Sequence, residues 1–430
     1  MPDPKQMTRR GWLRGLGPAV AASGLAMAGQ KAHAAEKGRS RKTQGLNYYE
    51  KLGVTPFINA AGTYTVLSAS TMPEEVQAAI AVASKYPVQI EELHAAAGKY
   101  LAQRLRCDAA LVTAGAASAL TLGTAACITA GNDPAILRIP TDMTGLKNEV
   151  IVQKAHRYDY DHALRNCGIR FVEVETLEDY QAAFNDRTVM AHFFNAAEGG
   201  AIIREDWVRV AHEHGVPCFN DAAADVPPIA NLWNYTQMGF DLVTFSGGKG
   251  IRGPQCTGLL LGRKDLIAAA LKNNSPYSNT IGRGMKVGKE EIIGLVAAVD
   301  WLLAQDEQKM QTEFQRRAEQ IAQHLKSLPS VETEIFVPPV ANHVPHLLIT
   351  YSPQHIKITA RQVMEKLRQG KPRIELNPAT GDRAASAGLK SGEHTIVVGV
   401  WMMGAGEDLI VARRLHEVLR AATAEPFAGR

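Results

Sequence analysis

A lysine flanked by glycines points most directly to chemistry in this sequence. Residues 241–255 (DLVTFSGGKGIRGPQ) predict a β-strand that ends at Ser246, with Lys249 three residues later. The glycines allow a tight turn and a close approach of the backbone to a ligand. At the carboxyl edge of an α/β sheet, such a lysine faces bound ligands and can form a Schiff base. The alternative is a surface lysine in a glycine turn. A P-loop is excluded, because Gly250 occupies the position of the Mg²⁺-binding hydroxyl.

Two features upstream of Lys249 suit a cofactor that is bound through a Schiff base. Strand 216–219 runs into Asp221, whose carboxylate can pair with a protonated pyridine nitrogen, although a helix N-cap is the alternative. Strand 110–113 is followed by a turn and a helix start whose open amides favour a phosphate, with Thr113 adding a hydroxyl. The residues of this turn are Gly115, Ala116, Ala117 and Ser118. A small-residue helix packed on the sheet is the alternative there. The order of cradle, aspartate and lysine predicts pyridoxal 5′-phosphate as the cofactor.

Alternating strands and helices must position these residues. Short β-rich runs and amphipathic helices (177–184, 204–215) alternate, which predicts an α/β fold with a mostly parallel sheet covered by helices. The expected strands are 110–113, 135–139, 170–174, 189–194, 216–219, 241–245 and 257–262. A long helix over 290–327, expected to bend, leads into a smaller C-terminal α+β domain. Its expected strands are 346–351 and 394–400, and its expected helices are 358–370 and 407–422.

The N-terminus predicts an export signal. Arg9 and Arg10 precede a short apolar run that ends in a small-x-small cleavage pattern at Ala34, which is typical of a twin-arginine-type signal peptide. A disordered basic tail is the alternative. The expected organisation is a signal peptide (1–34), a linker (35–44), an N-terminal segment (45–72), a cofactor-binding large domain (73–300), and a spine helix with the small domain (301–430). We therefore expect a periplasmic protein, or a cytoplasmic one if the leader is not functional.

Composition excludes several protein classes. The 430 residues are 46% hydrophobic and 21% charged, which argues against disorder, collagen and coiled coil. Five cysteines without a CxxC pair exclude a disulfide scaffold and a zinc ribbon. The formal charge of +4 is carried entirely by residues 1–34, so the rest is neutral and offers no basic surface for nucleic acid. The apolar run is too short for a membrane span. His212 and His214 do not share a helix face, so no metal site is expected.

The sequence resembles the fold-type I pyridoxal-phosphate enzymes, in particular the selenocysteine-synthase-like branch and its D-glucosaminate-6-phosphate ammonia-lyase group. The segments that carry the resemblance are 58–76, 88–105, 110–120, the region around His156, 220–225, 246–260 and 281–295. The small domain is matched only loosely. The resemblance also implies a class V aminotransferase-like enzyme that works as a homodimer or larger assembly, to which segment 279–284 contributes.

Residue roles follow from this resemblance. Lys249 is the Schiff-base lysine and Asp221 the pyridine partner; Gly115, Ala116, Ala117 and Ser246 occupy phosphate-binding positions. His156 is a candidate to stack on the cofactor ring. Arg283 and Arg373 are weaker candidates to clamp a substrate carboxylate, because a guanidinium binds one bidentately; a structural salt bridge is the alternative for each.

The leading functional hypothesis is a lyase. An amino acid or amino sugar acid would lose ammonia or water by α,β-elimination and give a 2-keto acid, with Lys249 taking the α proton. An amino-acid racemase or aldolase is the alternative on the same scaffold, and a non-catalytic binding protein is the alternative of another class. The neutral mature chain argues against a tRNA substrate. The expected export argues for an unphosphorylated substrate.

Overall fold

The computed structural model describes residues 47–197, 200–381 and 391–423. The described residues fall into two units, 47–55 and 56–423. In the first unit the described part holds helix α1 (Tyr48–Leu52), which Asn47 caps through its side chain and which ends at Gly53 with φ +71°. The predicted signal peptide and linker lie outside the described residues.

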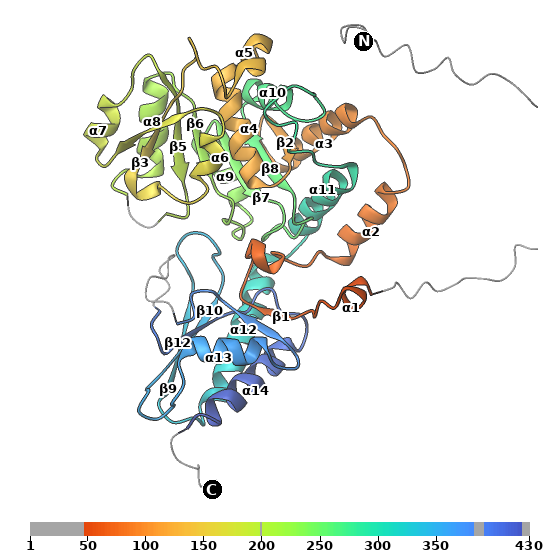
Figure 1. Cartoon of the computed structure of the whole chain (residues 1–430), viewed down its shortest axis with the longest axis vertical. Helices are drawn as coiled ribbons and strands as arrows, with labels where there is room; N and C mark the ends of the chain where they lie inside the picture. Colours follow the sequence, from red (N-terminus) through yellow and green to blue (C-terminus); the bar gives the residue numbers. More distant parts are fainter. Residues whose placement is uncertain (1–46, 198–199, 382–390, 424–430) are drawn as a thin grey trace, which may run out of the picture. The chain divides into compact units, whose positions relative to one another are not determined.

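The second unit is built on a seven-stranded sheet (Figure 1). In spatial order its strands are β2 (Ala109–Thr113), β8 (Gly258–Gly262), β7 (Leu242–Ser246), β6 (Cys218–Asp221), β5 (Thr188–Phe194), β3 (Glu149–Gln153) and β4 (Arg170–Val174). The neighbours from β7 to β4 pair in parallel, while β8 runs antiparallel to both β2 and β7. The predicted fold class, an α/β fold with a mostly parallel sheet, is confirmed.

Helices cover both faces of this sheet. Successive strand residues point to opposite sides, and the strands carry apolar side chains on both, so each face needs a cover. Leu260 of β8 packs into one apolar cluster, whereas its neighbours Leu259 and Leu261 pack into the other. One face carries α2 (Glu74–Ala83), α3 (Ile90–Leu105), α7 (Leu177–Ala182), α8 (Arg204–Glu213), α9 (Asn231–Met238) and α11 (Lys289–Leu303). The other carries α4 (Ala116–Thr129), α5 (Asp133–Arg138), α6 (Asp161–Arg165) and α10 (Lys264–Lys272).

A separate apolar cluster joins the C-terminal elements to an early segment. It involves a three-stranded antiparallel sheet, a two-stranded parallel sheet and three helices. These elements are β9 (Val331–Phe336), β10 (His346–Tyr351), β12 (Thr395–Gly399), β1 (Ile58–Ala60), β11 (Ile374–Leu376), α12 (Glu307–Leu325), α13 (Ala360–Arg368) and α14 (Glu407–Arg420). Residues 56–423 nevertheless form one compact unit, so the proposed boundaries at 72 and 300 stay predictions.

Two expected elements differ in the structure, and one observed strand of the large sheet was not expected. The expected strand 135–139 is wrong, because Asn132 caps a helix there: its side chain accepts from Ala135 N at 3.1 Å. The sequence prediction omits β3, a β-branched run (EVIVQ) that becomes a buried strand between β5 and β4. The long helix over 290–327 bends as expected, and the bend is a complete break, since Asp306 caps a new helix, α12.

In the described part of the chain, no helix is long and apolar enough to cross a membrane. All five cysteines are free. The exclusion of a disulfide scaffold stays a prediction.

Candidate cofactor site

The strand register brings the predicted site residues to one edge of the sheet. Gly258, at the start of the reversed strand β8, pairs with Thr113 of β2 on one side and with Ser246 of β7 on the other. Asp221 of β6 pairs with Thr244, two residues before Ser246. The ends of β2, β7 and β6, where the phosphate cradle, the lysine loop and the aspartate begin, therefore lie side by side.

Lys249 lies in the glycine loop that follows β7. The loop packs tightly, since a Cβ built on Gly250 would stand 1.9 Å from the carbonyl oxygen of Val226. Burial lowers the pKa of the Lys249 amine, and the negative charges of Asp221 and Asp225 oppose that shift. Among the described residues, Lys249 lines a cavity of about 160 Å³. A buried amine with a lowered pKa that faces a cavity fits attachment to an aldehyde.

Asp221 ends strand β6 and is 2% exposed. Its Oδ1 accepts a hydrogen bond from Ala223 N at 3.0 Å, and its Oδ2 accepts one from the Tyr158 hydroxyl at 2.5 Å. Burial raises the pKa of Asp221, while these two hydrogen bonds and the charge of Lys249 counteract the rise. Asp221 does not cap a helix, because the next helix, α9, begins at Asn231.

Helix α4 begins at the predicted phosphate cradle. Its N-cap is Gly115, with φ +90°, and no side chain caps the first turn. The first amides of the helix, on Ala116, Ala117 and Ser118, therefore have no partner within the helix, and an added Cβ on Gly115 would meet open space. An anion fits there. The hydroxyls of Thr113 and Ser118 donate to the carbonyls of Gly115 and Ala114, so the cradle consists mainly of backbone amides.

The segment after β3 supplies an aromatic residue that sequence reasoning missed. His156 is buried, its Nδ1 accepts from Phe194 N at 3.3 Å, and its ring meets Phe193 edge-on. Tyr158, two residues later, reaches Asp221 instead. The proposed stacking role of His156 stays a prediction, and the structure brings Tyr158 closest to the aspartate. Its only sequence signal was its place in the same segment as His156.

Neither candidate arginine lines the cavity that contains Lys249. Arg373 pairs with the buried carboxylate of Glu375 at 3.0 Å, as Arg368 also does, which is the structural alternative. Arg283 is exposed on the segment before α11. The described lining instead provides neutral polar groups, which the sequence analysis did not identify: Thr63, Tyr64, Tyr160, Asn342, His346 and Asn377.

The cavity's polar groups are held by hydrogen bonds. Asn377 accepts from the Tyr64 hydroxyl at 3.2 Å and donates to the Ala61 carbonyl at 3.0 Å. The Nδ1 atom of His346 lies 2.8 Å from the Val344 carbonyl. A carbonyl can only accept, so Nδ1 carries the proton and Nε2 is left as an acceptor. Burial lowers the pKa of His346, which favours this neutral form.

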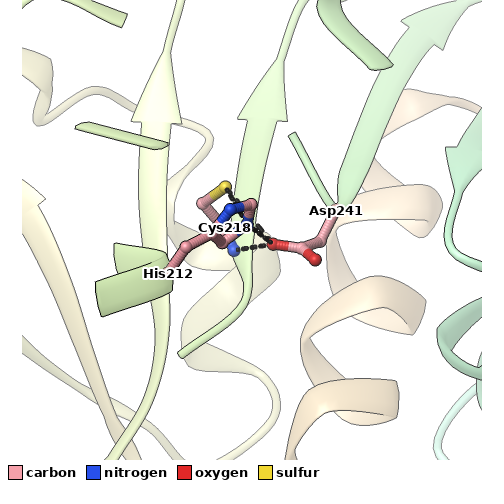
Figure 2. Close-up of side chains that lie close together, drawn as sticks. All are labelled: His212, Cys218 and Asp241. Atoms are coloured by element: carbon pink, nitrogen blue, oxygen red, sulfur yellow. Dashed lines mark hydrogen bonds and ion pairs between the residues drawn. The ribbon is translucent and has the colours of Figure 1, made fainter. Parts of the chain in front are cut away.

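A group of potential metal ligands lies at the opposite edge of the sheet, where β6 and β7 begin. Among the described residues, His212, Cys218 and Asp241 bring their ligand atoms within 4.8 Å of one another (Figure 2). Asp241 Oδ2 already accepts from Cys218 N at 2.8 Å and from His212 Nε2 at 2.9 Å, and Arg263 binds Oδ1. Burial also raises the pKa of the Cys218 thiol, which disfavours a thiolate ligand. This arrangement is a complete hydrogen-bond network, and the absence of a metal stays a prediction.

Known proteins share this architecture. A family model described as aminotransferase class-V matches residues 169–348. The 5′-C-glycyluridine monooxygenase-decarboxylase of a Streptomyces species is 31% identical over 342 residues, which cover 76% of this chain and 83% of that protein. The D-glucosaminate-6-phosphate ammonia lyase of Salmonella typhimurium is 31% identical over 266 residues, or 59% of this chain and 69% of the relative.

Structural and weaker sequence matches agree. The structure of a D-glucosaminate-6-phosphate ammonia-lyase superimposes with a TM-score of 0.74 at 25% identity, covering 87% of this chain and 99% of that chain. The L-seryl-tRNA(Sec) selenium transferase of Aquifex aeolicus is 24% identical over 46% of this chain and 49% of its own length. The chain therefore belongs to the aminotransferase class-V family of fold-type I proteins and is a pyridoxal-phosphate-dependent enzyme similar to the ammonia-lyases.

Proposed function

We propose that this enzyme acts at the α carbon of an amino acid or amino sugar acid that bears a β-hydroxyl. The α proton and the β-hydroxyl leave as water, and hydrolysis of the resulting enamine releases ammonia and a 2-keto acid. The observation that carries the proposal is the meeting of Lys249, Asp221 and the α4 amide cradle at one sheet edge. Pyridoxal phosphate, when bound, supplies a ring that stabilises negative charge at the α carbon of the substrate.

Each protein group has a distinct proposed task. The amides of the cradle hold the phosphate, and Asp221 holds a proton at the ring nitrogen. Lys249 attaches the cofactor and, once released by the substrate, takes the α proton. Burial lowers the pKa of its amine, which favours the neutral form that accepts a proton. Trp401, which is 5% exposed, contributes an apolar side chain to the lining of the cavity. Ser246 and His156 remain proposed cofactor contacts through the resemblance.

The cavity favours a substrate with neutral hydroxyl groups. Apart from Lys249, its described lining carries no cationic residue, whereas hydroxyl, amide and imidazole groups are present. The unprotonated Nε2 of His346 suits a hydroxyl or ammonium donor. We therefore propose an unphosphorylated substrate. The ammonia lyase relative is named for a phosphorylated sugar acid, so a matched pair of amino sugar acids, with and without phosphate, tests the choice.

The experiment uses the purified full chain and a panel of hydroxylated amino acids and amino sugar acids. The expected result is release of a 2-keto acid and ammonia. Borohydride added before the substrate should reduce the bond between the cofactor and Lys249 and so trap the cofactor on this residue. A trapped adduct on Lys264, Lys286 or Lys289 would contradict the lysine assignment. Exchange of the α proton without formation of a keto acid would indicate a racemase instead. Cofactor binding without any turnover would indicate a binding protein. The similar proteins favour neither alternative.

A second candidate function is oxidative decarboxylation of a glycyl-type amino acid. The specific observation in its favour is the match to 83% of the glycyluridine monooxygenase-decarboxylase. The requirement for oxygen discriminates between the two reactions, because elimination proceeds under anaerobic conditions and a monooxygenase reaction does not. Turnover that requires oxygen and releases carbon dioxide would therefore replace the lyase proposal.

We also propose that the enzyme is exported with its cofactor bound and works as a homodimer. The paired arginines of the leader support a route for folded proteins, and the cofactor's phosphate ester is difficult to acquire outside the cytoplasm. Replacement of Arg9 and Arg10 by lysines should leave a folded, yellow precursor in the cytoplasm. Normal export of this variant, or an uncleaved cytoplasmic wild type, would contradict the proposal and make a phosphorylated sugar acid the first compound to test.

A further inference from the structure

The Tyr158 hydroxyl occupies a defined position beside the carboxylate of Asp221. It donates to Asp221 Oδ2 at 2.5 Å. Oδ1 of the same carboxylate accepts from the backbone at Ala223. An ionised carboxylate offers about four acceptor positions, so two remain for the ring nitrogen of the cofactor. Tyr158 and the ring nitrogen can therefore bind Asp221 together.

Packing holds the tyrosine in this orientation. Its ring stacks on Phe194 with the centroids 3.9 Å apart and the planes 16° apart, and lies nearly parallel to His192 at 6.1 Å. The preceding residue, Arg157, forms ion pairs with Asp161 and Glu173, which fix the backbone of the segment. Removing the hydroxyl alone should therefore leave the ring in place.

The chemical effect of this hydrogen bond has a definite sign. A donor to a carboxylate stabilises its charged form, and here it acts against burial, which raises the pKa of Asp221. A less basic Asp221 leaves the shared proton on the ring nitrogen. A more basic Asp221 would draw that proton onto itself.

We propose that Tyr158 is a positioning residue, whose hydroxyl orients Asp221, keeps its carboxylate ionised and thereby keeps the proton on the ring nitrogen of the cofactor. The inference rests on the proposed role of Asp221. It assigns no contact between Tyr158 and the substrate.

The test compares cofactor binding to Tyr158→Phe and to wild type, using the full chain stripped of cofactor. Each protein is titrated with pyridoxal phosphate and with an analogue that carries C–H in place of the ring nitrogen. The ratio of the two dissociation constants isolates the nitrogen contact. Tyr180→Phe is the matched control, because Tyr180 is also stacked, on Trp207 at 4.0 Å, and its hydroxyl donates to the Trp207 carbonyl at 2.9 Å.

Wild type and Tyr180→Phe should prefer pyridoxal phosphate equally, and Tyr158→Phe should lose about tenfold of that preference, which corresponds to about 1.4 kcal/mol. With ¹⁵N-labelled cofactor, the ring nitrogen resonance of Tyr158→Phe should move toward the unprotonated value. An unchanged preference and an unchanged resonance would overturn the role of Tyr158. A wild type with no preference would instead refute the role of Asp221, and with it this part of the proposed function.

A graded variant covers the case in which Tyr158→Phe does not fold. Replacing Tyr158 with 4-aminophenylalanine keeps the shape of the side chain and donates a weaker hydrogen bond. Its preference for pyridoxal phosphate should fall between the wild-type value and no preference. A preference equal to wild type would overturn the proposal.

Discussion

Replacing Asp221 with asparagine separates a role in chemistry from a role in stability. The amide is isosteric, so its oxygen can still accept from Ala223 and its NH₂ group can donate to the Tyr158 oxygen in place of the present bond. The fold should therefore be retained. The amide is neutral, however, and cannot keep a pyridine nitrogen protonated.

The magnitude follows from the loss of an oriented charge in a buried site. Removal of one pre-organised electrostatic contact slows a reaction by about 10²–10³-fold. We expect the exchange of the substrate α proton for deuterium to slow by this factor in Asp221→Asn, measured by NMR in deuterated buffer with the cofactor saturating. The reduced adduct at Lys249 should still form, because the amine and its loop are unchanged.

Asp221→Asn should slow the reaction but should not lower the free energy of unfolding. Burial raises the pKa of Asp221 in the folded protein, so the folded state binds this proton more tightly than the unfolded chain does. Its contribution to the free energy of unfolding of the cofactor-free enzyme is present at low pH and is lost as pH rises through the folded pKa. Asparagine removes this dependence. At neutral pH the melting temperature of cofactor-free Asp221→Asn should equal or exceed that of wild type.

Two results would refute this reasoning. Near-normal proton exchange in Asp221→Asn with bound cofactor would remove Asp221 from the chemistry. A clear drop in melting temperature would show that the carboxylate is needed for the fold. Either result would change the role assigned to Asp221, although its position in the fold would be the same.

Other outcomes can be measured directly. Lys249→Ala should keep the circular dichroism spectrum and lose the borohydride-reducible adduct; a retained adduct would contradict the attachment. Gly250→Ala should cost about 1–3 kcal/mol of unfolding free energy and weaken cofactor binding, because the added methyl overlaps the Val226 carbonyl; unchanged denaturation would show that the loop relaxes. His346→Gln should raise KM about fivefold with little change in cofactor affinity, as expected for one neutral hydrogen bond; an unchanged KM would exclude a substrate contact. Light scattering should give a dimer, and a fully active monomer would end the proposal for segment 279–284.

The sequence predicted the sheet well because its strands carry a simple signal. Runs such as 257–262 are short, apolar and bounded by glycine, so they can be recognised without knowing their neighbours. The run 135–139 misled because apolar character alone does not separate a strand from a helix, and the deciding feature was the Asn132 cap. Strand order and the reversal of β8 depend on long-range pairing, which local pattern does not encode.

The site was predictable where chemistry constrains short motifs and not where contacts are tertiary. Asp221 ends strand β6 and Lys249 follows the end of β7 by three residues, so their positions could be predicted from spacing, while their roles stay predictions. His346 and Asn377 come from the C-terminal elements and reach the cavity only through the fold. Arg373 was predicted as a weak candidate for a substrate carboxylate because guanidinium groups bind carboxylates. The structure shows that it pairs with Glu375 of the protein itself.

The pairing of β1 with β11 has a consequence for synthesis of the chain. β1 is synthesised long before its strand partner β11, and the Asn377 amide that binds the Ala61 carbonyl is 316 residues further along the chain. Closing so long a loop is slow, and the unpaired strand edge is exposed until it happens. The C-terminal sheet and helices therefore cannot be completed co-translationally as an independent unit. A fragment that begins at residue 301 would lack β1, and residues 58–60 of a nascent chain need protection until strand β11 has been synthesised.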